Sequence, residues 1–393
     1  MPRTTSHAFR VLFGSIVCSL LAVNVAAAPT PNSRSNSFTT SNFTSLVARA
    51  PAPISFPLGI SGQDGSYFAS IAMGASGKKF NVVVDNGSPV FWLLSETSEQ
   101  LVRPSSSSTF KAYEANGWGM QYDEKSTAVG FVAQDKLTIG GVSLDDMPFG
   151  VAKTVTGLLV NAFEDGIMGF PPRTRSPTRL PAILEVFAAN SLIPAMISGW
   201  RLPRRADGGG GGEVMLGGTN PAKFDASTLV EVDNVDATGN HWKVSVSAVK
   251  IDGKAVISTE LTAQVDTGTS DIRANPAISR ALLMKIPGVQ FLAAGSDEED
   301  NQEGSQKGTN GEYVLPCNTE SKLAFTIGGK DWDVDPRDLA LGARGLPDNV
   351  CLSHIFGDPG LNEDEIFLGA AFLKNVYLSL NLDTNKVGLA MPK

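Results

Sequence analysis

The sequence predicts a mostly β protein of two related lobes, on three observations. Most of the chain after about residue 53 consists of short alternating apolar and polar runs bounded by Gly, Asn or Asp, such as "YFASIAMG" and "AFTIGGKDWDV", a pattern typical of strands and hairpins. Helical patterns occur only near 180–193 and 275–286, each with a Pro near its start. The third observation is an internal echo.

The echo consists of two pairs of motifs in the same order. Asp85 ends the run "FNVVVD" and Asp266 ends "LTAQVD", and a Gly followed by Ser or Thr lies just behind each. The run "GIMG" then reaches Gly169, at 169 − 85 = 84 residues, and "IFLG" reaches Gly369, at 369 − 266 = 103 residues. Two matches in register predict a duplicated lobe, with each lobe supplying one carboxylate to a shared cleft.

The chain divides into four expected segments. Residues 1–27 place Arg before an apolar run and small residues after it, which predicts a secretory signal peptide; a signal anchor is the alternative, although the run is short for a membrane span. Residues 28–52, rich in Ser, Thr, Asn and Pro with a glycosylation sequon at Asn42, are expected to be a pro-segment or linker. The lobes are expected at 53–222 and 223–393. We therefore expect a secreted, extracellular protein.

Charge and histidine content limit the possible partners. The 393 residues carry a formal net charge of −8, and the pI is near 5.1, which argues against a nucleic-acid or anionic-membrane partner. Outside the signal segment no apolar run is long enough to span a bilayer. Because His7 lies in the signal, His241 and His354 are the histidines that remain. Two histidines offer few ligands for a His-rich metal site and few candidates for a Ser-His relay, and we expect no metal.

The cysteines favour one disulfide. Cys18 lies in the signal, so the secreted chain keeps Cys317 and Cys351. In an oxidising compartment these two residues favour a bridge that closes a loop of 351 − 317 = 34 residues. Two free, buried thiols are the alternative.

Two carboxylates at one site suggest acid–base chemistry. At close range they cannot both ionise easily, so they share a proton and one acts as base while the other acts as acid. Such a pair can activate a water for attack on a carbonyl without a metal or a covalent intermediate. Gly87 and Gly268 allow close approach of the backbone, and Ser88 and Thr269 can hydrogen-bond the outer carboxylate oxygens. For Asp85 alone, a capped turn is the alternative, because Asp-Asn-Gly is a strong turn sequence.

These motifs resemble those of the pepsin-like aspartic peptidases. The segment "VDTGTS" matches the family pattern, Trp92 stands seven residues after Asp85, and "YDEKSTAVGFVAQDKLTIGG" resembles the family's flap hairpin, with Tyr122 as its tyrosine. Further landmarks in the family order are "PSSSSTF", "DGIMGF", "GGEVMLGG", "GEYVLPC" and "FLGAAFLKNVYLSLNLDTNKVGLA". The resemblance covers roughly Phe56 to Lys393, and secreted fungal members with few cysteines are the nearest comparison.

The resemblance implies a bilobal pepsin-like acid protease fold with an interlobe cleft. It implies a secreted aspartic endopeptidase, made as a zymogen and active at acidic pH, that binds an extended polypeptide, needs no cofactor and is a monomer. Asp85 and Asp266 would be the catalytic dyad, and a Cys317–Cys351 bridge fits the C-terminal lobe. The substrate-binding residues would be Tyr122 in the flap, Trp92 as its support, Ile167 in an apolar pocket, and Gly87, Gly268 and Thr269.

Four residues depart from the family pattern. Asn86 stands where the family has a Thr or Ser that braces the opposite loop, Asp123 and Glu124 add charge at the flap tip, and Ala370 replaces an Asp. None of them removes a catalytic carboxylate. The alternative function is therefore a catalytically impaired homologue that binds peptide or polysaccharide in the cleft. A plain structural protein would leave the two Asp motifs unexplained.

Overall fold

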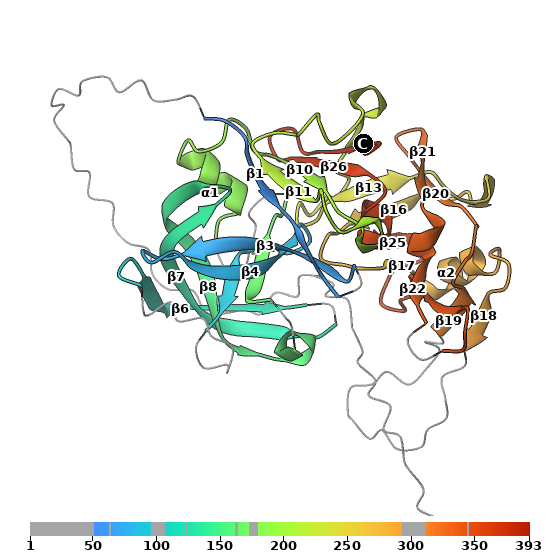
Figure 1. Cartoon of the computed structure of the whole chain (residues 1–393), viewed down its shortest axis with the longest axis horizontal. Coiled ribbons are helices and arrows are strands. Elements are labelled where there is room, and N and C mark those ends of the chain that lie inside the picture. The colour runs from blue at the N-terminus through green and yellow to red at the C-terminus, as the bar shows by residue number, and fades with distance from the viewer. Residues whose placement is uncertain are drawn as a thin grey trace, which may run out of the picture.

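The computed structural model describes residues 51–62, 64–95, 107–122, 124–161, 164–172, 180–292, 312–343 and 346–393 (Figure 1). The expected signal peptide, nearly all of the expected pro-segment with Asn42, and the flap residue Asp123 lie outside these residues. Strands dominate the described part, and the prediction of a mostly β fold is confirmed. No helix in this part has the length and apolar character required to cross a membrane.

The first half of the chain forms an eight-stranded sheet, drawn in blue to green in Figure 1. Its strands follow the order β2 (Gly59–Ser61), β3 (Ser66–Met73), β4 (Lys78–Asp85), β9 (Gly166–Gly169), β5 (Trp92–Leu94), β8 (Val142–Val155), β7 (Thr127–Ile139) and β6 (Lys111–Gln121). Asp85 therefore ends β4, and β6 and β7 form a long hairpin at the edge of the sheet.

The second half forms three smaller sheets. The five-stranded sheet has the order β13 (Lys243–Val246), β16 (Leu261–Val265), β25 (Glu365–Leu368), β17 (Ile272–Ala274) and β24 (Ile355–Gly357). One four-stranded sheet contains β15 (Lys254–Ile257), β14 (Ala248–Ile251), β20 (Leu323–Ile327) and β21 (Lys330–Val334). The other contains β18 (Gln290–Leu292), β19 (Glu312–Pro316), β23 (Val350–Ser353) and β22 (Ala340–Gly342).

The same four-strand arrangement occurs in both halves. In the first half β4 pairs in parallel with β9, β9 pairs antiparallel with β5, and β5 pairs in parallel with β8. In the second half β16, β25, β17 and β24 repeat these directions in the same order. The internal echo in the sequence therefore corresponds to a repeated strand topology, and each Asp motif lies at the end of the first strand of its repeat.

A six-stranded sheet joins the two halves. It has the order β1 (Ile54–Pro57), β11 (Glu213–Leu216), β10 (Ile197–Arg201), β26 (Tyr377–Asn381), β27 (Lys386–Ala390) and β12 (Val230–Asp233). Figure 1 shows its strands β1, β10, β11 and β26 between the two halves. Strands β1, β10 and β11 come from the first half of the chain, and β12, β26 and β27 come from the second. The backbone hydrogen bonds of this sheet therefore connect the two halves.

The helices are short. Both sequence-predicted helical segments form helices, α1 (Ile183–Ala189) and α2 (Pro276–Leu283), whereas α3 (Ala370–Leu373) was not expected. In α2 the Asn275 side chain accepts a hydrogen bond from the backbone N–H of Ala277 and Pro276 occupies the first turn, so local sequence explains where the helix begins. In the part of the chain that the structure describes, the 3-10 helices are η2 (Gly157–Asn161), η3 (Arg205–Asp207), η4 (Ala226–Thr228) and η5 (Pro336–Leu339).

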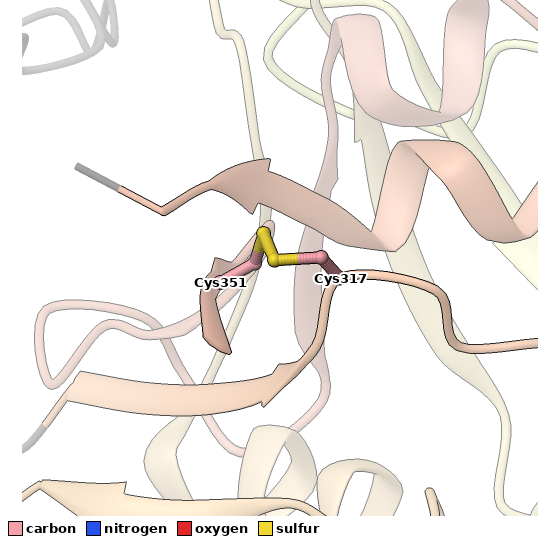
Figure 2. Close-up of a disulfide and its surroundings, with 2 residues drawn as sticks. All are labelled: Cys317 and Cys351. Carbon is pink, nitrogen blue, oxygen red and sulfur yellow. A yellow bond between two sulfur atoms is a disulfide. The ribbon is translucent and has the colours of Figure 1, made fainter. Parts of the chain in front are cut away.

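The disulfide is confirmed. Cys317, directly after β19, is bonded to Cys351 in β23, across a sequence separation of 34 residues (Figure 2). The backbone N–H of Cys317 also donates to the carbonyl of Asn349 at 3.1 Å. The bridge thus joins two strands that are already paired.

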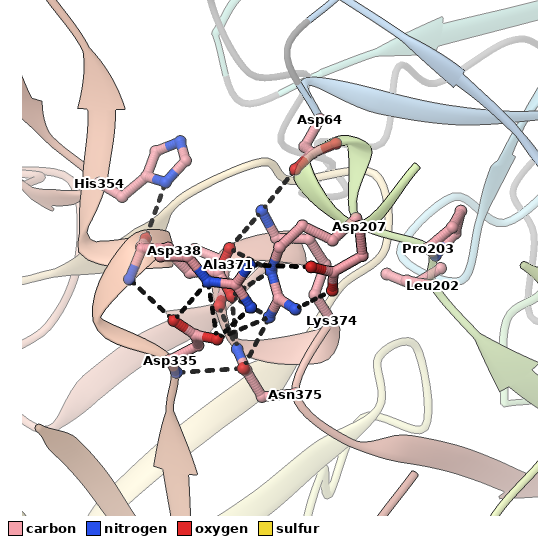
Figure 3. Close-up of polar contacts among 12 residues, drawn as sticks. Asp64, Leu202, Pro203, Asp207, Asp335, Asp338, His354, Ala371, Lys374 and Asn375 are labelled. Carbon is pink, nitrogen blue, oxygen red and sulfur yellow. Dashed lines mark hydrogen bonds and ion pairs between the residues drawn. The ribbon is translucent and has the colours of Figure 1, made fainter. Parts of the chain in front are cut away.

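A buried charged network, here named the Arg204 cluster, connects distant segments (Figure 3). Its members are Arg204, Asp338 in η5, Lys374 after α3, and Asp64 between β2 and β3. Asp338 lies 2.5 Å from Arg204 Nη2 and 2.7 Å from Lys374 Nζ, and Lys374 Nζ also lies 3.0 Å from an Asp64 oxygen. Figure 3 shows Lys374 between Asp338 and Asp64. The cluster therefore links the start of the first half to the end of the second.

Candidate active site

The two motif aspartates meet in the fold. Asp85 ends β4 and Asp266 directly follows β16, and their exposed fractions are 1% and 0%. Their side chains are hydrogen-bonded to each other. A Cβ atom at Gly87 would lie 2.6 Å from an oxygen of Asp266, and a Cβ at Gly268 would collide with the carboxyl group of Asp85. Glycine at both positions thus lets each loop approach the opposite carboxylate.

The hydrogen-bond donors around the two carboxylates differ. Asp85 accepts from the backbone N–H groups of Gly87 at 2.8 Å and Ser88 at 3.1 Å, and from the Ser88 hydroxyl. Asp266 accepts from the backbone N–H of Gly268 and the hydroxyl of Thr269, each at 2.9 Å. The larger donor set favours the ionised form of Asp85.

Burial raises the pKa of both aspartates. For Asp85 this effect is opposed by the hydrogen bonds from Ser88, Asp266 and Gly87, so its pKa is raised only in part. For Asp266 burial and the nearby charge of Asp85 act together, and its pKa lies well above the usual range. The pair therefore favours a state in which Asp85 is ionised and Asp266 holds the shared proton.

Asn86 braces the two aspartate loops. Its side-chain Nδ2 donates to the Val265 carbonyl at 2.9 Å, and its Oδ1 accepts from the Thr267 backbone N–H at 2.6 Å. In return the Thr267 hydroxyl donates to the Val84 carbonyl at 3.0 Å and accepts from the Asn86 backbone N–H at 3.1 Å. The carboxamide supplies one donor and one acceptor, so the residue that departs from the family pattern makes two bonds across the loops.

The predicted flap residues are also close together. Trp92 Nε1 donates to the Tyr122 hydroxyl at 2.7 Å, and both side chains are buried. Tyr122 lies at the turn of the β6–β7 hairpin, where its backbone N–H donates to the Ser126 carbonyl at 2.9 Å. Ile167 in β9 pairs in register with Trp92 and is buried in the core beside it. The hairpin is therefore tied to the sheet that carries Asp85.

Sequence reasoning missed two features of this region. Trp118, on β6, packs against Trp92 with ring centroids 5.9 Å apart, and it adds a second aromatic contact between the hairpin and the sheet. Its position four residues before Tyr122, on the same face of an extended strand, is a signal that alternation could have given. Gln264 lies two residues before Asp266 and is buried, although its strand appeared to be an ordinary one.

Within the described ranges no group of three or more His, Cys, Asp or Glu side chains is arranged to hold a metal ion. His241 and His354 are both buried, and burial lowers the pKa of each imidazole. His354 Nδ1 contacts the Asp338 carbonyl at 2.8 Å, which places this ring beside the Arg204 cluster.

The comparison with protein families agrees with this geometry. The family model "Eukaryotic aspartyl protease" matches residues 66–392, and the chain belongs to this family. The protein is accordingly an aspartic peptidase, a hydrolase of pepsin-like type.

Similar curated proteins are fungal. The chain is 27% identical to "Probable aspartic-type endopeptidase CTSD" of Arthroderma benhamiae, over 94% of this chain and 69% of the relative. It is 26% identical to "Aspartic-type endopeptidase ctsD" of Aspergillus fumigatus, over 88% and 69%. It is 27% identical to "Rhizopuspepsin" of Rhizopus chinensis, over 84% and 79%.

Proposed function

We propose that the protein is a secreted aspartic endopeptidase that cleaves extended polypeptides at acidic pH, with Asp85 and Asp266 as its catalytic dyad. The observation that carries the proposal is the buried, mutually hydrogen-bonded carboxyl pair with unequal donor sets. The matched family and the names of the fungal relatives support the same activity.

The unequal donor sets support a different role for each carboxyl group. Ionised Asp85 removes a proton from a water molecule, whose oxygen attacks the peptide carbonyl carbon, while protonated Asp266 donates its proton to the carbonyl oxygen. The tetrahedral intermediate then returns a proton to Asp266 and the C–N bond breaks. Asp85 gives its proton to the departing amine, which leaves the pair in its starting state.

The surrounding residues position the substrate in this proposal. The Trp92–Tyr122 hydrogen bond holds the base of the flap, which closes over an extended peptide. Ile167 contributes an apolar wall next to the scissile bond, while Gly87, Gly268 and Thr269 form the loops on which the peptide backbone rests. Neither a metal nor a cofactor takes part in these steps.

Secretion is supported by the N-terminal pattern of residues 1–27 and by the disulfide, because such bonds persist in oxidising compartments. Residues 28–52 would be a removable pro-segment, which makes the nascent chain a zymogen, and the mature protein would be a monomer.

An impaired, peptide- or polysaccharide-binding homologue is the competing function. It was suggested by Asn86 and by the charged flap tip. The bracing bonds of Asn86 to Val265 and Thr267 favour the enzyme, because this departure supplies hydrogen bonds between the two loops.

A cleavage assay tests the proposal. The secreted chain, after acid activation, is incubated with an unfolded protein substrate at acidic pH, with and without pepstatin, and the Asp85→Asn variant serves as the matched control. We expect pepstatin-sensitive cleavage by the parent and none by the variant. A correctly folded, processed parent that cleaves no substrate would favour the impaired homologue.

A further inference from the structure

One row of side chains crosses the five-stranded sheet beside Asp266. Cross-strand neighbours in register lie on the same face of a sheet. The strand registers place these residues in one row: Lys243, Gln264, Phe367, Arg273 and Phe356. Asp266 lies two residues beyond Gln264, and its backbone N–H continues the pairing by donating to the Leu368 carbonyl at 3.2 Å, so it falls on the same face.

The opposite face of this sheet is the core. Its residues, which alternate with the row, all belong to the main hydrophobic cluster: Val244, Ala263, Val265, Ile366, Leu368, Ile272, Ala274 and Ile355. Phe367 is only 6% exposed, yet this apolar row residue does not belong to that cluster, and the half-buried Phe356 does not pack against it. The row therefore faces away from the core, on the side of the sheet that carries Asp266. Figure 1 shows β13, β16, β25 and β17 side by side in this part of the molecule.

The repeated topology gives this row a counterpart in the first half. The equivalent row crosses β3, β4, β9, β5 and β8 through Phe68, Val83, Ile167, Trp92 and Gly150. It contains Ile167, proposed as an apolar wall next to the scissile bond, and Trp92, which holds the base of the flap through Tyr122. Gln264 occupies the place of Val83, and Phe367 the place of Ile167. The row in the first half is apolar throughout, whereas the row beside Asp266 contains the polar side chains of Lys243, Gln264 and Arg273.

Gln264 has an unused hydrogen-bond donor. Its side-chain Nε2 is buried and has no partner among the described residues. Burying such a donor unpaired is costly, so a partner supplied by a ligand would be favoured. The neighbouring charges are already paired: Lys243 Nζ lies 3.1 Å from Glu365, and Arg273 lies 3.2 Å from Asp271 and 3.7 Å from Asp358.

We propose that Gln264 is a specificity-determining residue that hydrogen-bonds an Asn or Gln side chain of the substrate next to the scissile bond. This inference rests on the proposed function. The charges of Lys243 and Arg273 are neutralised by Glu365, Asp271 and Asp358, and Asp266 holds the shared proton, so the surroundings favour neither an anion nor a cation. A neutral carboxamide suits this site, because its oxygen accepts from Gln264 Nε2 and its nitrogen donates to Gln264 Oε1. Phe367 packs against its methylene groups.

Matched peptides test the inference. Two peptide pairs carry either Gln or its near-isostere Met on one side or the other of the scissile bond, and kcat/KM is measured for the parent, Gln264→Met and Thr262→Val. Thr262 lies on the same strand and face as Gln264 but two residues further from Asp266. We expect the Gln-to-Met preference of the parent to fall on the order of tenfold in Gln264→Met at one of the two positions. It should stay unchanged in Thr262→Val.

The outcomes separate the two proposals. Equal preferences in parent and Gln264→Met at both positions, or an equal loss in Thr262→Val, would overturn the role of Gln264 while cleavage itself upholds the peptidase. A parent that cleaves none of the peptides would overturn both. Thermal unfolding of each variant excludes misfolding, and Thr262→Val, which lies outside the proposed contact, should cleave all the peptides at the parental rate.

Discussion

The aspartate pair and the Arg204 cluster both contain buried carboxyl groups, yet the pKa values are raised in the pair and lowered at Asp338 in the cluster. Asp85 and Asp266 face each other, and burial raises the pKa of both, with the charge of Asp85 adding to the effect on Asp266. Burial also acts to raise the pKa of Asp338, but the hydrogen bond from Arg204 and the charge of Lys374 outweigh it and lower that pKa.

The difference shows that the charge of the partner, more than the depth of burial, decides whether a buried carboxyl group stays protonated or ionised. Like charges at the pair keep one proton in place, which suits acid–base chemistry. Two cations at Asp338 keep that group ionised and let it hold distant segments together. The first arrangement should therefore govern activity and the second stability, and the following variants test this division.

Removing either member of the pair should have the largest effect on activity. Asp85→Asn and Asp266→Asn keep the side-chain shape but remove a titrating group, so we expect kcat/KM to fall roughly 10³–10⁴-fold. Peptide cleavage at acidic pH measures this loss, with circular dichroism as a check of the fold. Near-parental activity in either variant would remove that residue from the dyad.

Breaking the Arg204 cluster should change stability instead. Asp338→Asn leaves Arg204 and Lys374 buried with too little negative charge, and we expect a loss of about 3–5 kcal/mol in the free energy of unfolding. Urea denaturation measures the loss, while kcat/KM of the folded variant stays near the parental value. The control is Asp331→Asn, whose partner Lys250 lies at the surface and which should cost less than about 1 kcal/mol. Equal losses in the two variants would contradict the assignment.

The two regions should also differ in how stability depends on pH. The raised pKa of Asp266 means that its stabilising contribution is complete below the ordinary carboxyl pKa and is lost as pH rises through the folded value. Asp266→Asn should therefore be more stable than the parent at neutral pH, and this gain should shrink in acid.

Asp338 should behave in the opposite way. Its lowered pKa gives a contribution that is present above the ordinary carboxyl pKa and lost as pH falls through the folded value. The penalty of Asp338→Asn should shrink in acid. Denaturation curves at several pH values test both trends, and parallel trends for the two variants would show that the sites are not electrostatically distinct.

The smallest effect is expected at Asn86. A Thr hydroxyl can accept from the Thr267 N–H and donate to the Val265 carbonyl, as the Asn86 carboxamide does, so Asn86→Thr should change kcat less than about fivefold. Asn86→Leu, which can do neither, is the control and should lose far more. A large gain in Asn86→Thr would mean that the carboxamide braces the loops poorly.

Local sequence was sufficient for the strand-rich fold, for α1 and α2, and for the disulfide. It was sufficient because strand alternation, a Pro at a helix start and a pair of cysteines are signals carried by neighbouring or few residues. The meeting of Asp85 with Asp266 depended on two motifs in register and on the family resemblance, since no local pattern joins residues so far apart.

The roles of Asn86, Gln264 and the Arg204 cluster depend on contacts that strand alternation does not encode, whereas alternation could have indicated Trp118. Asn86 departs from the Thr or Ser of the family pattern, yet its carboxamide makes bonds to both Val265 and Thr267, because its donor and acceptor are separate atoms. In the sequence, Gln264 is one polar residue of an alternating strand. Its place in the row beside Asp266 follows from the cross-strand registers with Lys243 and Phe367. The Arg204 cluster draws its members from four separate segments, so its pairing follows from the fold.

The pH dependence of kcat/KM for peptide cleavage by the processed parent tests the central claim most directly. With Asp85 ionised and Asp266 protonated in the active state, the profile should be bell-shaped with its maximum in the acid range. Its falling limb should lie above the ordinary Asp pKa, because burial and the charge of Asp85 raise the pKa of Asp266, and activity should be nearly absent at neutral pH. An optimum at or above neutrality would mean that another group performs the chemistry.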